Sequence, residues 1–240
     1  MKYYGVEYAR GYAQIAARGL SSWGEFHSEG GFESFAAKEL LESALPTLSF
    51  MTSPPRALEY GCGTGPGACY LARNGYDVEG IDLNSTAIEL ARQQAETRQL
   101  DIRFRVEDIC AITDPSPGYD LILDSYCLQS IVLDADRQRL FEVVKSLLLP
   151  DGYYLIGTAI WHPDRLYGAH HLDPRTGMSY RRIESGGQAE EDAVEIDGLW
   201  YLPHRRHLTP EALRREIESA GFDVRYQQGG HFVLTLGRGC

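Results

Sequence analysis

The chain has 240 residues, of which 43% are hydrophobic and 24% charged, which is ordinary for a folded globular protein. Its formal net charge of −11 argues against a dominant nucleic-acid surface, which would be basic. The sequence shows neither an apolar run near the ~20 residues of a membrane span nor a signal-peptide core at its N-terminus.

Residues 1–53 precede the first predicted strand and are expected to form an N-terminal helical cap. Aromatic and apolar residues recur there at helical spacing, namely Tyr4, Tyr8, Tyr12 and Ile15. Residues 21–31 are predicted to be a loop, and residues 34–45 a second amphipathic helix that Pro46 ends.

Strand-like and helix-like segments alternate regularly from Arg56 to residue 159. The first strand runs into a segment in which glycine occupies every second position: Gly61, Gly63, Gly65 and Gly67. Glycine lacks a Cβ, so such a segment turns tightly and lets a ligand approach its backbone. A helix follows, and Gly75 stands where its C-terminal cap is expected. These features predict a nucleotide-shaped site at the carboxyl edge of a parallel sheet.

Two carboxylates frame that predicted site. Glu59 stands just before the glycines, and Asp82 ends the next apolar run about 20 residues later, where a carboxylate binds ribose hydroxyls. The spacing Gly63-x-Gly65-x-x-Ala68 also fits a dinucleotide fingerprint, which would put a pyrophosphate on the loop. However, a carboxylate at Glu59 repels phosphate and attracts a cation.

The segment from Glu59 to Gly65, Glu-Tyr-Gly-Cys-Gly-Thr-Gly, closely resembles motif I of the class I S-adenosylmethionine-dependent methyltransferases. Their cofactor carries a sulfonium and an ammonium and no phosphate, in keeping with Glu59. The resemblance covers about residues 55–159 and 208–237. It implies an α/β fold with a seven-stranded, mostly parallel, doubly wound sheet, and S-adenosylhomocysteine as the product.

The later elements are expected to complete that sheet. Thr86-x-x-Glu89 is predicted to open one helix as a capping box, and Thr209 followed by Pro210 is predicted to open another. Two strands then follow around Gly229 and Gly230, and the family's sheet closes with such a pair, the last strand antiparallel. We therefore predict a single domain with a Rossmann-like core at 54–159 and 208–240. The remaining residues, 160–207, are expected to form an acceptor-pocket insertion.

The resemblance also assigns roles to residues along the cofactor. Gly61, Gly63 and Gly65 would pass under its methionine and ribose portions, and Glu59 would hold the ammonium. The ribose hydroxyls would bind Asp82, and adenine would contact Leu83. Asp108 would bind the adenine amine, with Ile109 packed nearby; the alternative for Asp108 is a carboxylate that caps a turn.

The fourth strand ends at Asp124, at an edge that in this fold faces the sulfonium and the acceptor, so Asp124 joins the predicted cofactor site. Candidate catalytic residues are Tyr126 and Gln129 after that strand and His162 after the fifth. Trp161 is a further candidate for the pocket, while Tyr8 and Trp23 are candidates to cover the cofactor; the alternative for each aromatic is the core. Many relatives carry a Leu-His-His sequence where this chain has Leu128, Gln129 and Ser130, so no base carries over from them.

No metal is predicted. Histidines 162, 170, 171, 204 and 207, with the acidic residues 190–192, match no recognisable zinc spacing. None of the five cysteines, at positions 62, 69, 110, 127 and 240, forms a C-x-x-C pair. We expect reduced thiols and a cytoplasmic location.

The sequence therefore predicts methyl transfer to a small-molecule acceptor by in-line displacement, with an oxygen, nitrogen or carbon nucleophile. Alternatives are a protein or RNA methyltransferase with residues 160–207 as a docking surface, an NAD(P)-linked oxidoreductase, and a non-catalytic ligand-binding protein on the same fold. A nucleic-acid or membrane partner is not expected, and the oligomeric state is not predicted.

Overall fold

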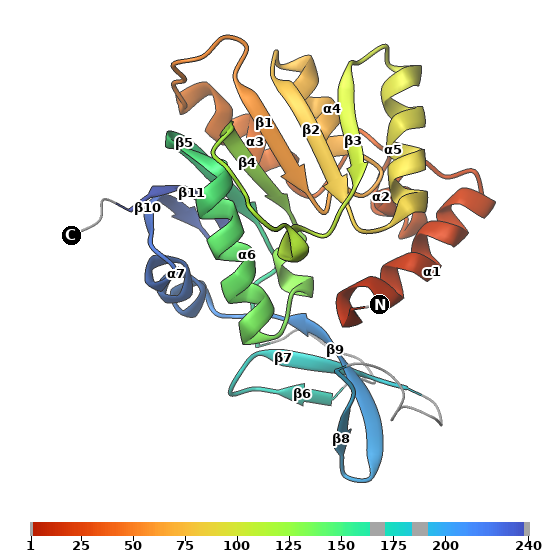
Figure 1. The fold of residues 1–240 in the computed structure, drawn as a ribbon. Coiled ribbons are helices and arrows are strands. Elements are labelled where there is room, and N and C mark those ends of the chain that lie inside the picture. The colour runs from red at the N-terminus through yellow and green to blue at the C-terminus, as the bar shows by residue number, and fades with distance from the viewer. Residues whose placement is uncertain (1, 164–170, 184–191, 238–240) are drawn as a thin grey trace.

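The computed structural model describes residues 2–163, 171–183 and 192–237. Seven strands form one sheet in the order β10-β11-β5-β4-β1-β2-β3 (Figure 1). Their bounds are β1 Arg56–Tyr60, β2 Asp77–Asp82, β3 Ile102–Val106, β4 Tyr119–Ser125, β5 Leu148–Gly157, β10 Phe222–Gln228 and β11 His231–Leu236. Strands β3, β2, β1, β4 and β5 pair in parallel, whereas β11 pairs antiparallel with both β5 and β10. The predicted fold class is confirmed.

Helices cover both faces of this sheet. The helices are α1 Tyr3–Ala17, α2 Trp23–Phe26, α3 Lys38–Ala44, α4 Pro66–Arg73, α5 Ser85–Thr97, α6 Asp134–Leu147 and α7 Pro210–Ser219, with 3-10 turns η1 Leu45–Thr47, η2 Ile109–Ala111 and η3 Leu128–Ser130. Side chains of α3, α4 and α5 share one core cluster with alternate strand residues such as Ala57 and Leu121. Those of α6 and α7 share another with Leu58 and Ile122. Successive side chains of each strand point to opposite faces of the sheet, so each strand contributes to both core clusters.

The insertion contains a second sheet, which the sequence did not predict. Its strands, β6 His171–Asp173, β7 Met178–Arg182, β8 Val194–Ile196 and β9 Leu199–Arg206, form an antiparallel sheet in the order β6-β7-β9-β8. The backbone N–H of Trp161 donates to the carbonyl of Leu208 at 2.8 Å and so joins the two ends of the insertion. In Figure 1 this second sheet lies beyond the carboxyl ends of the main strands, on the side where α1 lies.

The N-terminal cap is helical as expected, with two differences. The loop predicted for residues 21–31 contains the short helix α2, opened by Ser22, whose side chain accepts from the N–H of Glu25. The second helix begins at Lys38 rather than at residue 34. The predicted aromatic face of α1 is buried at Tyr4, Tyr12 and Ile15, and it packs against α5 and the second sheet.

The predicted capping box at Thr86 is wrong. Asn84 opens α5 instead, because its side chain accepts the N–H of Ala87 at 3.0 Å. Asn84 follows β2 so closely that its own N–H donates to Asp82. The helix therefore begins within two residues of the strand end and brings its N-terminus to the predicted site. The other predicted start, at Thr209, is confirmed, since its hydroxyl accepts the N–H of Ala212.

Candidate functional site

The glycine turn joins β1 to α4 and has a backbone shape that requires glycine. Gly61, Gly63 and Gly65 have φ angles of +59°, +56° and +82°, in the left-handed region that L side chains rarely adopt. Pro66 then begins α4 at once. At Gly67, a Cβ would lie 2.3 Å from Oε1 of Glu59, so a larger residue there would displace that carboxylate.

Glu59 is the second-last residue of β1, beneath this turn, and is only 1% exposed. Its carboxylate accepts the N–H of Ala68, while its buried Oε2 has no hydrogen-bond partner among the described residues. Burial raises the pKa of Glu59 to about 8; the Ala68 N–H lowers it, and the charges of Asp124 and Asp82 raise it further. A buried carboxylate oxygen that lacks a donor fits a cationic donor such as an ammonium.

Asp82 ends β2 on the other side of the turn and is 7% exposed. One of its oxygens accepts the N–H of Gly63 and the other that of Asn84, both at 2.9 Å. Burial raises the pKa of Asp82 to about 6 against the lowering effect of these two bonds. Because each carboxylate oxygen has two lone pairs, the carboxylate retains acceptor capacity for a pair of hydroxyls. The residues present therefore fit both ends of the predicted cofactor.

The residues predicted to contact adenine lie near the start of α1. Asp108 caps η2 by accepting the N–H of Cys110 at 2.9 Å, and it also accepts the hydroxyl of Tyr4 at 2.6 Å. Leu83 is half-buried and packs against the cluster that contains Tyr4. Ile109 is buried in the core cluster beneath α6. Asp108 thus caps a turn, as in the alternative, and bonds to Tyr4 of the cluster against which Leu83 packs.

Asp124 is occupied by hydrogen-bond donors of the chain itself. It is fully buried, and it accepts the Tyr60 hydroxyl at 2.5 Å and the N–H groups of Cys127 and Leu128 at 2.7 and 2.9 Å. Burial raises the pKa of Asp124 to about 6, although the three bonds and the charge of Arg137 lower it. Its observed contacts hold the loop after β4 in shape.

Two of the three candidate catalytic residues lie at the same edge of the sheet. Tyr126 follows β4 with φ +64°, a strained conformation for a tyrosine of the kind that clusters at functional sites. Its N–H donates to Gly157 of β5 at 2.7 Å, and Oε1 of Gln129 accepts the N–H of Ala159 at 3.2 Å. Both residues therefore lie where β4 and β5 end. His162 is exposed, so it is not enclosed with them.

Helix α1 brings two tyrosines to this site: Tyr12, to which the sequence assigned no site role, and Tyr8, a predicted cover of the cofactor. Tyr12 lies over the glycine turn, because a Cβ on Gly63 would be 2.7 Å from its hydroxyl oxygen. The hydroxyls of Tyr8 and Ser130 lie 2.7 Å apart, and the Arg205 guanidinium lies 5.1 Å from the centre of the Tyr8 ring. The four-residue spacing of Tyr8 and Tyr12 indicated that they share one helix face, but periodicity does not show which groups their hydroxyls contact. Trp23 packs edge-on against the Tyr8 and Tyr12 rings.

Among the described residues, no three His, Cys, Asp or Glu side chains are placed to hold a metal ion. His170 and residues 190 and 191 of the acidic group lie outside the described residues, as does Cys240. No described helix is both long enough and apolar enough to cross a membrane.

Comparison with known proteins gives the same picture. The family described as "Methyltransferase domain" matches residues 57–152. The chain is 31% identical over 101 residues to a ubiquinone biosynthesis O-methyltransferase of Coxiella burnetii, covering 42% of each chain. It is also 27% identical over 194 residues to a demethylmenaquinone methyltransferase of Thermus thermophilus, covering 79% of this chain and 82% of that one. The chain thus spans less than half the length of the Coxiella enzyme.

Among solved structures, an S-adenosylmethionine-dependent methyltransferase from Clostridium acetobutylicum matches with a TM-score of 0.61 at 14% identity, covering 90% of this chain and 96% of that one. The likeness establishes the fold. The matched domain and the sheet order, with its antiparallel β11, agree with one another. Residues 57–152 thus match a methyltransferase domain, and the chain has the fold of solved S-adenosylmethionine-dependent methyltransferases.

Proposed function

We propose that this protein transfers the methyl group of S-adenosylmethionine to a small-molecule acceptor and releases S-adenosylhomocysteine. The observation that carries the proposal is the pair of buried carboxylates around the glycine turn, in which Oε2 of Glu59 lacks a donor. A sulfonium compound with an ammonium and two ribose hydroxyls supplies what these groups can accept.

In this proposal each part of the cofactor has its own residues. Gly61, Gly63 and Gly65 pass beneath the methionine and ribose portions, Glu59 holds the ammonium, and Asp82 accepts the ribose hydroxyls. Around adenine lie Leu83, Asp108 and Ile109. Asp124 acts from behind, since its three bonds fix the start of the loop after β4.

The acceptor is proposed to lie over the ends of β4 and β5, beside Tyr126 and Gln129. Two elements border this edge: α1 reaches it through the Tyr8–Ser130 contact, and Leu202 of the second sheet packs with Val132 and Tyr3. Borders on two sides favour a small acceptor over a macromolecular surface. The names of the relatives, which refer to ubiquinone and demethylmenaquinone, support a small acceptor.

The bound cofactor supplies a methyl group on a positively charged sulfur. The chain's part is to orient the acceptor and keep water out, because displacement at carbon needs an aligned nucleophile and charge is neutralised as it proceeds. We assign no general base. A reducing, cytoplasmic location is also proposed, supported by free thiols at Cys62, Cys69, Cys110 and Cys127.

Calorimetry with S-adenosylmethionine, S-adenosylhomocysteine and NADH tests the cofactor assignment. The wild type should bind the first two and not NADH, and Asp82→Ala should weaken S-adenosylhomocysteine by about 100-fold, since a buried carboxylate that accepts hydroxyls is lost. Asp77→Ala is the matched control, because Asp77 opens the same strand but forms surface ion pairs with Arg56 and Arg103. Binding of NADH, or equal losses in both variants, would contradict the assignment.

The acceptor class needs a second experiment. Phenols, amines and carbon acids of quinone-like size are incubated with labelled cofactor, and release of S-adenosylhomocysteine is followed. Label transfer to a small molecule is expected. Transfer only to protein or RNA would replace the small-molecule part of the proposal and leave the cofactor assignment standing.

A further inference from the structure

Residues 126–133 form the loop between β4 and α6, here called the β4–α6 loop. It begins against the glycine turn, since a Cβ on Gly61 would lie 2.5 Å from Sγ of Cys127. Its middle carries Gln129, bonded to the end of β5, and Ser130, in contact with Tyr8. The position of this loop therefore sets the acceptor edge relative to the cofactor turn.

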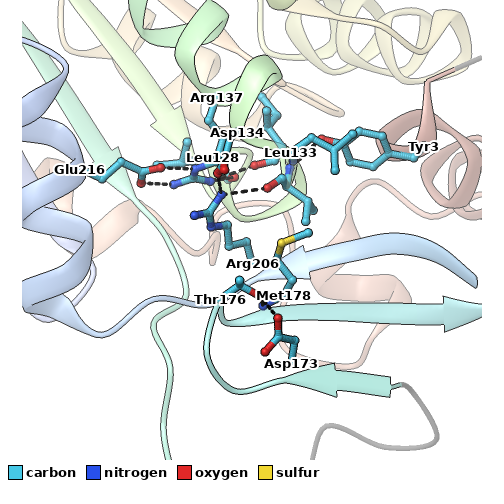
Figure 2. A network of polar contacts seen from close by, with 12 residues as sticks. Tyr3, Leu128, Leu133, Asp134, Arg137, Asp173, Thr176, Met178, Arg206 and Glu216 are labelled. Atoms are coloured by element: carbon cyan, nitrogen blue, oxygen red, sulfur yellow. Dashed lines mark hydrogen bonds and ion pairs between the residues drawn. The ribbon is translucent and has the colours of Figure 1, made fainter. Parts of the chain in front are cut away.

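Arg137, in the first turns of α6, holds this loop from behind. It is 2% exposed, and its Nη1 donates to the carbonyls of Leu128 and Ile131, both at 2.9 Å. Its Nε and Nη2 donate to the two carboxylate oxygens of Glu216 on α7 at 2.7 and 2.6 Å (Figure 2). One guanidinium thus fixes the two carbonyls that flank Gln129 and Ser130, and a second helix fixes the guanidinium.

Other backbone groups of the same loop form hydrogen bonds with residues of different elements. Asp124 accepts the N–H groups of Cys127 and Leu128. Tyr3 and Arg206 bond to the last residues of the loop (Figure 2). The Tyr3 hydroxyl accepts the N–H groups of residues 132 and 133, and Nη1 of Arg206 donates to the carbonyl of residue 132. The N-terminal cap, through Tyr3, and the second sheet, through Arg206, are therefore both bonded to this loop.

A buried ion pair is weak support for stability, because desolvation of the two charges offsets most of their attraction. A well-packed apolar pair would serve the core as well. What the Arg137–Glu216 pair adds is geometry, since a planar guanidinium with both its edges bonded holds the two loop carbonyls in one arrangement. The hydrogen bonds and the ion pair of Arg137 among the described residues go to Glu216 and to the loop carbonyls, so its influence passes through the loop backbone.

We propose that Arg137 is a positioning residue for methyl transfer, oriented by Glu216, and that it sets the acceptor's alignment by fixing the β4–α6 loop. The inference rests on the proposed function. Alignment is where an in-line displacement is most sensitive, and a misplacement of about 1 Å costs up to about 100-fold in rate. The residues proposed for the cofactor instead lie at the ends of β1, β2 and β3, outside the hydrogen-bond partners of Arg137 and Glu216 given above.

The test compares Glu216→Gln with Glu218→Gln. Both changes are isosteric and lie on α7, but Glu218 forms an exposed pair with Arg214. With an acceptor from the screen above, Glu216→Gln should lower kcat about 10- to 100-fold while the Kd of S-adenosylhomocysteine stays within about twofold. Glu218→Gln should match the wild type in both quantities.

Hydrogen exchange supplies a readout that needs no acceptor. The amides of residues 127–133 should exchange faster in Glu216→Gln at unchanged protection of β1 and β2, and Arg137→Lys should show the same pattern, because an ammonium cannot bridge both carbonyls and the carboxylate. Wild-type kcat or wild-type exchange in Glu216→Gln would overturn the proposal, as would a parallel loss of kcat and S-adenosylhomocysteine affinity. A wild type that fails to bind S-adenosylhomocysteine instead refutes the proposed function, and the exchange comparison still decides whether the loop is held as described.

Discussion

Glu59 is expected to lose a proton when S-adenosylmethionine binds at pH 7. In the protein alone, burial raises its pKa to about 8, so about 0.9 of the molecules carry a proton there at pH 7. An ammonium at the Oε2 position, which lacks a donor among the described residues, favours the charged form. If the pKa of Glu59 falls to its ordinary value on binding, about 0.9 proton is released per site. Asp82 adds little, since a pKa of about 6 leaves it mostly ionised.

Calorimetry in buffers of different ionisation enthalpy measures this release, because the slope of the binding enthalpy against that enthalpy counts the protons. The wild type should give a slope near one proton at pH 7 and near zero at pH 9, where Glu59 is already ionised. Glu59→Gln should give no slope at pH 7 and bind about 10- to 100-fold more weakly, the worth of one hydrogen bond to a charged group. S-adenosylhomocysteine should release the same proton, because it keeps the ammonium and lacks only the sulfonium charge.

The raised pKa of Glu59 also makes the free energy of unfolding depend on pH. A carboxyl whose pKa is raised in the folded state holds a proton that the unfolded chain gives up, so stability is greatest below its ordinary pKa of 4.5 and falls as the pH rises towards 8. The full cost is roughly 5 kcal/mol. Glu59→Gln should remove this dependence in urea unfolding at pH 5 and pH 8. A flat wild-type profile, or a proton release that survives in Glu59→Gln, would refute the reasoning.

Three further substitutions and one matched control test the scaffold by thermal unfolding, where ~1 kcal/mol shifts Tm by ~2–4 °C in a chain of this size. Gly63→Ala should destabilise by ~1–3 kcal/mol and weaken S-adenosylhomocysteine binding, because it meets both φ +56° and the Tyr12 hydroxyl; Gly75→Ala, at φ +87° in open space, should cost less and leave binding intact. Tyr60→Phe should cost ~2 kcal/mol by removing a buried donor to Asp124, and an undiminished Tm would contradict that. Thr209→Ala should cost ~1 kcal/mol through the lost N-cap with cofactor affinity unchanged; a loss of affinity would show that α7 acts on the site by another route.

The parts of the fold that the sequence predicted are those with local causes. The left-handed glycines follow from their spacing, and the strand pattern follows from burial of one or both faces. Thr209 followed by proline marks a helix start within three residues of chain. The capping box at Thr86 failed for a local reason as well: Asn84 is the first residue able to cap after β2 ends, so the helix starts before Thr86 is reached.

What the sequence did not predict depends on contacts across many residues. The second sheet is held by β7–β9 pairing across the undescribed residues 184–191, and its register shifts between Ser179 and Tyr180, so no clean alternation marks its strands. Tyr8 and Ser130 are 122 residues apart, and Arg137 and Glu216 are 79 apart. Asp124 was predicted from its position at a strand end, but only the structure shows that the chain's own donors occupy both its oxygens.

The three carboxylates at neighbouring strand ends differ in how well the protein compensates them. Asp124 has three donors and the charge of Arg137, Asp82 has two backbone N–H groups, and Glu59 has one N–H and an oxygen without a donor. The carboxyl that the protein compensates least therefore lies beneath the glycine turn, where an ammonium would favour its ionised form and a diphosphate would oppose it. This gradient separates the two ligands that the glycine spacing alone admits. It also explains how one chain keeps three buried acids close together: the fold's own donors occupy both oxygens of Asp124, leave Asp82 acceptor capacity, and leave one oxygen of Glu59 without a donor among the described residues.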